Sequence, residues 1–394
     1  MGVDTHKVEV VPVELEKHPD ADSLSIVRVY NFTCVVRTAD WQGVTKAAYV
    51  QPDSVLPDKP EYRFLKETMN LRKERQELWD KLQPDYESDL ARLDYDQKIA
   101  ALEARIDANT KYLRIGVRRL RGVISMGMLL PIPEHMNPAA IEIGDDLAEA
   151  LGITHYERLA EGEKLTAKGD DVAPPPQGIY VPMYDVESVY KYANLFESGE
   201  LVYVSEKLDG QNARFLATSA GNDSYVERSE SGHVQHCTNV DMHAGSRKEW
   251  KKKEGGSNWW RVQDQNPWIS KWCYDNQDQP LYGETFGWVG DLKYGSKQGQ
   301  LWFRAFDVLN GSEWLDAEAF RAAFYPDQRV PDFGIMPFDF EKLQKLADGP
   351  SLIKGANHIR EGIVIKPLKE RRHYKLGRVM VKMVSNAYLE KATR

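Results

Sequence analysis

A lysine in a tight turn is the first residue of this sequence whose setting suggests chemistry. Residues 201–215 read Leu-Val-Tyr-Val-Ser-Glu-Lys-Leu-Asp-Gly-Gln-Asn-Ala-Arg-Phe, which predicts a strand, a turn and a second strand. Lys207 ends the first strand beside Asp209 and the flexible Gly210, a setting that can hold a nucleophilic amine against a ligand. A solvent-exposed lysine in a hairpin is the alternative, because a four-residue pattern recurs by chance.

Further polar residues follow downstream, mostly on β-type segments. They form an ordered series: Arg228-Ser229, Leu281-Tyr282-Gly283-Glu284, Arg304-Ala305-Phe306-Asp307-Val308, Glu361-Gly362-Ile363-Val364-Ile365-Lys366 and Val379-Met380-Val381-Lys382. Five matches in one order are far more specific than any single match. The series resembles the covalent nucleotidyltransferase superfamily of polynucleotide ligases and capping enzymes over roughly residues 201–394.

Two features of the sequence indicate which members of this superfamily the chain resembles most. DNA ligases and capping enzymes usually carry an OB domain after the nucleotidyltransferase domain, whereas only 12 residues follow Lys382. Asn212 stands five positions after Lys207, as is common in RNA ligases. With an OB-like domain in front, the architecture resembles the Deinococcus-type ATP-dependent RNA ligases. The resemblance implies a nucleotidyltransferase domain of antiparallel sheets and helices, and an enzyme that seals 3′-OH/5′-phosphate nicks in duplex RNA or RNA/DNA hybrids.

The chemistry implied by this resemblance runs through a lysyl-AMP and an adenylylated RNA 5′ end, with ATP and Mg²⁺ or Mn²⁺ as cofactors. The attacking lysine must lose its proton near neutral pH, and neighbouring cations favour that loss. Lys366, Lys382 and a bound metal are therefore expected to lower the pKa of Lys207.

The resemblance also implies a role for each matching residue. Lys207 is the expected nucleophile and Glu361 the expected metal ligand, because hard divalent cations prefer oxygen. The other expected ATP contacts are Glu206 through its backbone, Asp209, Gly210, Arg228 at the ribose or at a phosphate of the 3′-OH strand, Glu284 at the ribose, Phe306 under the purine, and Lys366 and Lys382 at the α-phosphate. Asn212 and Arg228 are the expected RNA contacts.

One departure from the family pattern affects the last motif. RNA ligases of this superfamily often carry two alternating lysines there, but Met380 and Val384 flank Lys382 at the two-residue spacing. Lys366, Lys375 or Arg378 could supply the second phosphate contact. The role of Lys382 is therefore the least secure of the set.

Other interpretations stay open at this point. Phe306 could be an ordinary core residue, and Glu284 could pair with a surface lysine. The enzyme could be a GTP-dependent capping-type guanylyltransferase, or the chain could be a non-catalytic RNA-binding protein. His233, His236 and Cys237 invite a zinc interpretation, but no fourth ligand is evident. The chain has no Gly-x-x-x-x-Gly-Lys phosphate loop.

The amino-terminal part predicts a small antiparallel barrel. Its candidate strands are rich in β-branched and aromatic residues: 8–13, 25–30, 33–37 and 47–50. The segment His18-Pro19-Asp20-Ala21-Asp22-Ser23-Leu24 resembles the opening of OB-fold barrels that bind RNA.

Residues 64–112 interrupt this barrel with charged, helix-like sequence. Tyr95, Ile99, Leu102 and Ile106 recur at helical spacing, and Pro84 separates them from an earlier helical stretch. We therefore expect an inserted helical hairpin, with a coiled-coil dimer as the alternative. A proline-rich linker is expected at 161–180, between an OB-like domain at 1–160 and a nucleotidyltransferase domain at 181–394. The expected fold class is α+β.

The composition limits which kinds of nucleic-acid-binding surface the protein can have. The 394 residues are 42% hydrophobic and 28% charged, and 52 Lys+Arg against 60 Asp+Glu give a net charge of −8. A wholly basic surface is excluded, so any nucleic acid must meet local patches. Two basic runs stand out, one at 247–253 near three tryptophans and one at 366–382.

The remaining expectations concern the compartment and the partners. Cys34, Cys237 and Cys273 are too few for a disulfide framework. We expect a cytoplasmic protein with reduced thiols, no membrane span and no obligate protein partner.

Overall fold

The computed structural model describes residues 7–83, 88–156, 172–192, 194–228, 234–374 and 376–392, with residues 220–228 and 234–239 described by their backbone alone. The chain divides into two compact units, 1–158 and 159–392. Most of the predicted linker lies outside the described residues, so the domain limits stay a prediction. None of the described helices is both long enough and apolar enough to cross a bilayer.

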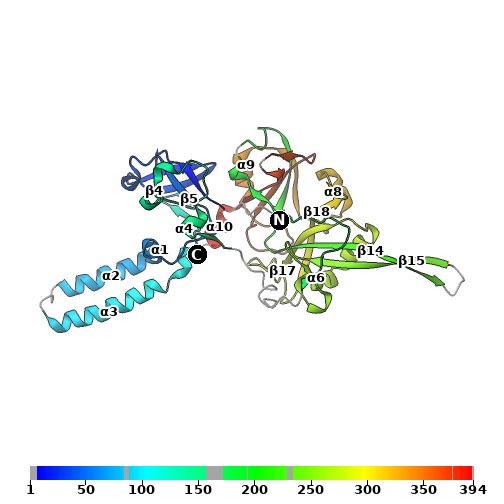
Figure 1. The fold of residues 1–394 in the computed structure, drawn as a ribbon, viewed down its shortest axis with the longest axis horizontal. Coiled ribbons are helices and arrows are strands. Elements are labelled where there is room, and N and C mark those ends of the chain that lie inside the picture. Colours follow the sequence, from blue (N-terminus) through cyan, green and yellow to red (C-terminus); the bar gives the residue numbers. More distant parts are fainter. Residues whose placement is uncertain are drawn as a thin grey trace. The chain divides into compact units, whose positions relative to one another are not determined.

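The first unit is built from short antiparallel strands, as the sequence predicts (Figure 1). One sheet has the order β1-β5-β9 and another β2-β3-β4, and two further pairs are β6 with β10 and β7 with β8. The bounds are β1 Val8–Pro12, β2 Glu16–Lys17, β3 Leu24–Val29, β4 Phe32–Arg37, β5 Lys46–Val50, β6 Ser54–Val55, β7 Val117–Leu120, β8 Val123–Met126, β9 Met128–Leu130 and β10 Thr154–His155. Val8, Val10, Ala48 and Val50 share one buried core.

Helices interrupt this unit between β6 and β7. They are α1 Arg63–Lys66, α2 Met69–Leu82 and α3 Asp89–Asp107, and the short α4 Ala148–Leu151 follows later. Leu71 of α2 packs with Leu102 and Ile106 of α3, while Trp79 meets Tyr95 edge to face. The predicted helical hairpin and its apolar stripe are therefore confirmed.

The second unit contains two larger sheets. One has the order β11-β16-β15-β14-β17-β18-β19 and the other β12-β24-β21-β13-β20, with a small pair β22-β23. The bounds are β11 Val172–Ala173, β12 Glu187–Ser188, β13 Leu201–Lys207, β14 Gln211–Arg228, β15 Val234–Gly245, β16 Trp250–Lys251, β17 Leu281–Gly287, β18 Leu301–Asn310, β19 Glu313–Trp314, β20 Asp332–Pro337, β21 Gly362–Pro367, β22 Arg372–His373, β23 Gly377–Arg378 and β24 Val381–Val384. Apart from the parallel pair β12 and β24, neighbouring strands of the two larger sheets run antiparallel.

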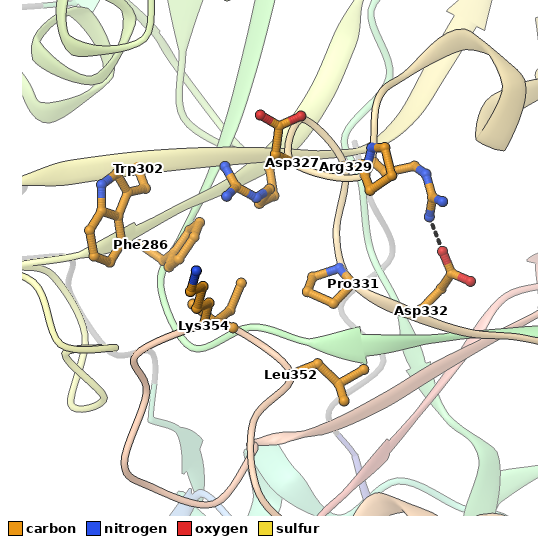
Figure 2. A pocket seen from close by; sticks show the side chains of 11 residues that line it. Phe286, Trp302, Asp327, Arg329, Pro331, Asp332, Leu352 and Lys354 are labelled. Atoms are coloured by element: carbon orange, nitrogen blue, oxygen red, sulfur yellow. Dashed lines mark hydrogen bonds and ion pairs between the residues drawn. The ribbon is translucent and has the colours of Figure 1, made fainter.

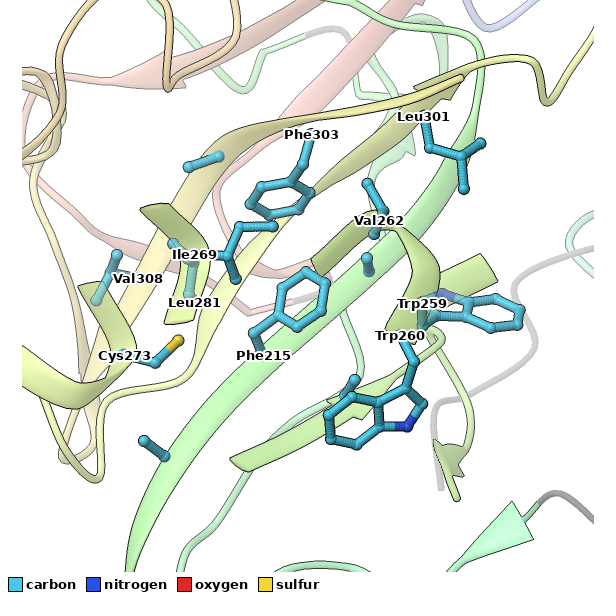
Figure 3. Close-up of a cluster of buried hydrophobic side chains, with 14 of the residues drawn as sticks. Phe215, Trp259, Trp260, Val262, Ile269, Cys273, Leu281, Leu301, Phe303 and Val308 are labelled. Atoms are coloured by element: carbon cyan, nitrogen blue, oxygen red, sulfur yellow. The ribbon is translucent and has the colours of Figure 1, made fainter. Parts of the chain in front are cut away.

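Helices complete the second unit. They are α6 Asn258–Gln265, α7 Trp268–Asp275, α8 Ala317–Ala323, α9 Phe340–Ala347 and α10 Asn386–Ala392. Helices α6 and α7 cover the seven-stranded sheet, where Trp259 and Ile269 pack with Phe215 and Phe303 (Figure 3). Period-two alternation then leaves the opposite side chains of β17 and β18, Glu284 among them, on the other face of this sheet.

Candidate active site

Strand register brings three predicted lysines to one face of the five-stranded sheet. Ser205 of β13 lies opposite Val364, which lies opposite Lys382, and Tyr203 lies opposite Lys366. Because residues directly opposite each other share a face and alternate residues repeat it, Lys207, Lys366 and Lys382 all belong to that face. Residues 175 positions apart in sequence are thus placed together by the sheet.

Lys207 is surrounded by carboxylates. Its Nζ donates to Glu361 Oε1 at 2.5 Å, and the two side chains are 27% and 13% exposed. Burial acts to lower the pKa of Lys207, but Glu361, Glu284 and Asp209 outweigh it and raise the pKa above its ordinary value. The expectation that neighbouring cations depress this pKa is therefore wrong for this structure.

Glu284 is held close to the lysine turn by a tight backbone approach. Asn212 lies opposite Glu284 in the β14–β17 ladder, and a Cβ on Gly210 would lie 2.1 Å from the Thr285 carbonyl oxygen and 3.1 Å from Glu284 Cγ. Only glycine fits there. Burial raises the pKa of Glu284 to about 8, against the opposing effect of Lys207.

Asp209 holds the lysine turn in place through hydrogen bonds of its side chain and of its backbone. Its Oδ2 accepts hydrogen bonds from the backbone N–H groups of Asp291 and Leu292, both at 2.8 Å. Its own N–H donates to the buried Tyr294 hydroxyl at 2.7 Å. Sequence reasoning missed Tyr294, and no local pattern could have identified it because the contact spans 85 positions.

Glu206 uses its side chain structurally. The buried carboxylate accepts from Ser351 Oγ and from Leu352 N, both at 2.6 Å. Its N–H donates to the Pro331 carbonyl at 2.8 Å. The predicted contact between the Glu206 backbone and adenine stays a prediction, and in this structure its donor already has a protein partner.

Lys366 belongs to a buried charge cluster. Asp307 Oδ2 accepts from Lys366 Nζ at 2.6 Å and from Tyr184 Oη at 2.6 Å, and it forms an ion pair with Arg378 Nη1 at 2.7 Å. Tyr184 also packs against Phe306, with ring centroids 4.5 Å apart. Two candidates for the missing phosphate contact, Lys366 and Arg378, are thus engaged by one carboxylate.

Lys382 is the less engaged cation on this face. Among the described residues it forms no ion pair within 4.0 Å, although it is half-buried. Burial, and then Lys207, lower its pKa from the ordinary value. A cation in this position suits an anionic ligand that arrives from outside.

Glu361 is the candidate ligand for a divalent metal in this site. Glu361 Oε2 is buried and has no hydrogen-bond partner among the described residues, and the carboxylates around it are the hard donors that Mg²⁺ and Mn²⁺ prefer. The described residues contain no group of three or more His, Cys, Asp or Glu suited to hold an ion alone. The arrangement fits an ion that keeps water or phosphate oxygens as its other ligands.

Asn212 has an unsatisfied acceptor beside Glu284. Its Oδ1 is buried without a partner in the part of the chain that the structure describes, and its carbonyl accepts from Trp259 Nε1 at 3.0 Å. The side chain of Arg228 lies outside the described residues, as do His233 and the side chains of His236 and Cys237. The predicted roles of all these residues stay predictions.

Several cations of the two basic runs are paired with acids. Trp250, Trp259 and Trp260 are buried, so they do not form an exposed stacking surface. Lys251 is buried beside Glu249 at 2.9 Å. In the second run several cations pair with acids: Lys366 and Arg378 with Asp307, Lys369 with Asp316 and Arg371 with Glu200.

A cavity of about 560 Å³ adjoins the strand that ends in Lys207. Figure 2 shows Phe286 and Trp302 along one side, with Pro331 and Leu352 across from them. Arg304 and Lys354 also line it. The carboxylates of Asp327 and Asp332 line it as well, and Asp332 pairs with Arg329.

Two parts of the chain match known family models. Residues 200–384, just under half of the chain, match the family model described as RNA ligase, and residues 7–79 match an OB-fold domain. No curated protein matches the chain by sequence.

Solved structures of Naegleria gruberi RNA ligase are similar in fold. Two mutants with ATP and Mn share 21% and 22% identity with this chain, each with a TM-score of 0.64, and cover 98% of it and 100% and 99% of their own chains. A third mutant, with AMP and Mn, has 22% identity, a TM-score of 0.64 and coverage of 98% and 100%. The predicted α+β fold with an amino-terminal OB domain is thus confirmed. Residues 200–384 are thus similar to RNA ligases, and residues 7–79 are similar to an OB-fold domain.

Proposed function

We propose that the protein is an ATP-dependent RNA ligase of the Deinococcus type that seals 3′-OH/5′-phosphate nicks in duplex RNA or RNA/DNA hybrids. The observation that carries the proposal is Lys207, which ends β13 against Glu361 and beside Glu284 within the region that matches RNA ligases. ATP and Mn in the Naegleria structures support ATP and a divalent metal as cofactors. Cys34 and Cys273, buried and free, are compatible with the proposed cytoplasmic location.

The proposed reaction has three balanced steps. Lys207 Nζ attacks the α-phosphorus of ATP, forms a P–N bond, loses a proton and expels pyrophosphate. An oxygen of the RNA 5′-phosphate then attacks that phosphorus, and the P–N bond breaks. This gives a 5′-5′ pyrophosphate, and the lysine nitrogen takes up a proton and is a free amine again. Finally the 3′-OH attacks the phosphorus of the RNA 5′-phosphate and loses its proton; the phosphodiester bond forms, and the pyrophosphate bond breaks to release AMP.

The charges around Lys207 suggest how the first step is controlled. Glu361 holds the protonated lysine before substrates bind. A divalent cation at Glu361 supplies positive charge, which offsets the carboxylates around the amine and the charge on the phosphates. Burial raises the pKa of Glu284 to about 8, and the protonated form of this carboxyl can donate as well as accept a hydrogen bond at the ribose hydroxyls.

Label transfer tests the proposed function. With Mg²⁺ or Mn²⁺, α-labelled ATP is expected to leave acid-stable label on the protein, and nicked RNA is expected to remove that label as it is sealed. Preferential labelling from GTP would instead favour a capping-type guanylyltransferase. RNA binding with no labelling from either nucleotide would favour a non-catalytic RNA-binding protein.

Lys382→Ala is expected to slow lysine adenylylation about 100-fold, because it removes one cation from the developing phosphate charge. Stability is expected to stay within about 1 kcal/mol of wild type, since no ion pair among the described residues is broken. Rapid-quench labelling and urea unfolding measure the two effects. Lys366→Ala is the contrast, because it breaks the pair with Asp307 and is expected to lower stability. Equal labelling rates for Lys382→Ala and wild type would contradict the phosphate role.

A further inference from the structure

Tyr294 is a buried residue with a strained backbone, in the segment that connects β17 and β18. Its side chain is fully buried, and its φ is 53°. A positive φ is uncommon for residues other than glycine, and it is strained for a bulky side chain. Strain of this kind persists only where the surrounding structure holds it, and it is concentrated at functional sites. We therefore asked which part of the site Tyr294 holds.

The side chain of Tyr294 reaches the turn that follows Lys207. Its hydroxyl oxygen accepts a hydrogen bond from the backbone N–H of Asp209 at 2.7 Å. Its ring belongs to the same buried apolar cluster as Leu208. Leu208 and Asp209 are the two residues directly after Lys207, so one tyrosine contacts the turn through both its ring and its hydroxyl group.

The residues just before Tyr294 enclose the Asp209 side chain. Asp209 Oδ2 accepts from the backbone N–H groups of Asp291 and Leu292. A Cβ on Gly290 would lie only 3.0 Å from Asp209 Oδ2 and 3.1 Å from the Asp209 carbonyl oxygen. The position of the lysine turn therefore depends on segment 290–294 as a whole, which ends at the strained tyrosine.

His358 holds the backbone of Tyr294. The Tyr294 N–H donates to His358 Nε2 at 3.2 Å, and the two rings are nearly perpendicular, with centroids 4.6 Å apart. Since Nε2 accepts, Nδ1 carries the proton and donates to the Ile359 carbonyl, 2.9 Å away. The imidazole thus connects the strained residue to the segment that leads into β21.

This series of contacts connects the nucleophile with its carboxylate partner. It starts at the turn after Lys207, passes through Tyr294 and His358, and ends two residues before Glu361. Lys207 Nζ donates to Glu361 Oε1 at 2.5 Å. The amine and the carboxylate are therefore held from the turn that follows one and from the segment that precedes the other.

We propose that Tyr294, held by His358, is a positioning residue that places Lys207 Nζ for attack on the α-phosphorus of ATP. The proposal rests on the proposed ligase function and adds to it two residues that act on the nucleophile through its turn. Attack needs the reacting atoms about 3–3.5 Å apart, and a displacement of about 1 Å can slow a reaction about 100-fold. Without the tyrosine hydroxyl, the buried Asp209 N–H would lose its acceptor, and the turn would move to find another.

Tyr294→Phe tests the proposal, because it keeps the ring and removes only the hydroxyl. In single-turnover labelling by α-labelled ATP, the maximal rate is expected to fall about 10- to 100-fold. The ATP concentration that gives half of this rate is expected to change less than about threefold. Sealing of a nick that already carries a 5′ adenylate is expected to stay within about threefold of wild type, because Lys207 forms no bond in that step. Equal slowing of labelling and sealing, or labelling at the wild-type rate, would overturn the proposal.

Tyr49→Phe is the matched control. Tyr49 is also buried, and its hydroxyl donates to the Met126 carbonyl at 3.0 Å in the first unit. Both variants lose one buried tyrosine hydrogen bond, so both are expected to unfold at lower urea concentrations than wild type. Only Tyr294→Phe is expected to slow labelling, whereas Tyr49→Phe is expected to stay within about twofold of wild type. Equal slowing in the two variants would contradict a positioning role.

Two substitutions of His358 test the second residue. His358→Leu removes the acceptor of the Tyr294 N–H and is expected to slow labelling about tenfold. His358→Gln can place an amide oxygen where Nε2 accepts, and it is expected to restore the rate to within about threefold of wild type. Equal rates for these two variants would contradict the role of His358. Absent labelling of wild type would overturn the ligase function, whereas normal labelling of wild type and of Tyr294→Phe would overturn only this inference.

Discussion

Lys207→Ala is expected to abolish labelling of the protein by ATP while sparing the sealing of RNA that already carries a 5′ adenylate. The reason is that the Lys207 amine forms its bond to phosphorus in the first step and is released when that bond breaks in the second step, so it takes no part in the third. Without that amine no lysyl-AMP can form, so sealing that starts from ATP should fall at least 10⁴-fold, to background. Gel assays with 5′-phosphate and pre-adenylylated nicks measure the two outcomes side by side.

The variant Lys207→Arg separates loss of the nucleophile from loss of the folded structure. Arginine retains the positive charge beside Glu361, but its guanidinium stays protonated and cannot attack. Lys342→Ala serves as the control, because that exposed lysine of α9 pairs only with Asp339 among the described residues. Label on the arginine variant equal to wild type would remove Lys207 from the mechanism, whatever the alanine variant does.

The strands around the site could be predicted because their sequences carry a local signal. Alternating apolar residues and the lysine turn indicate β13 and β14, and helical spacing indicates α3. Register then places Glu284 and Glu361 near Lys207 without further information. Local pattern and tertiary structure agree wherever one face of an element is buried.

The sequence did not allow the ion-pair partners of the lysines in the site to be predicted in the same way. In the sequence, Lys366 is one member of a basic run. In the folded chain it is buried against Asp307, which stands 59 positions earlier. Lys207 was expected among cations, but the nearest groups in space are carboxylates. Charge order along a chain does not determine which charges meet, because burial penalises any ion left unpaired.

The buried Asp307 cluster gives the largest expected effect on stability. Asp307 is fully buried, and its Oδ2 accepts from Lys366 and Tyr184 and forms an ion pair with Arg378. Asp307→Asn would leave Lys366 as a buried cation without its carboxylate, while Arg378 keeps Glu370. The free energy of unfolding is expected to fall by about 3–5 kcal/mol, as measured by urea titration at pH 7.

Asp316→Asn provides the matched control for this prediction. Asp316 pairs with the exposed Lys369, so the same chemical change is expected to cost no more than about 1 kcal/mol. If both variants lose the same stability, the buried cluster does not hold the strands together.

The pH dependence of stability gives a second test of the Asp307 prediction. Burial acts to raise the pKa of Asp307, but Arg378 and Lys366 outweigh it, so the pKa lies below its ordinary value. A carboxyl whose pKa is lower in the folded state stabilises the fold above its unfolded pKa of about 3.9 and loses that contribution as pH falls through the folded value. The gap between wild type and Asp307→Asn should therefore be full at pH 5–7 and shrink below about pH 4. A gap that stayed constant down to pH 3 would mean that lost packing, not lost charge, destabilises the variant.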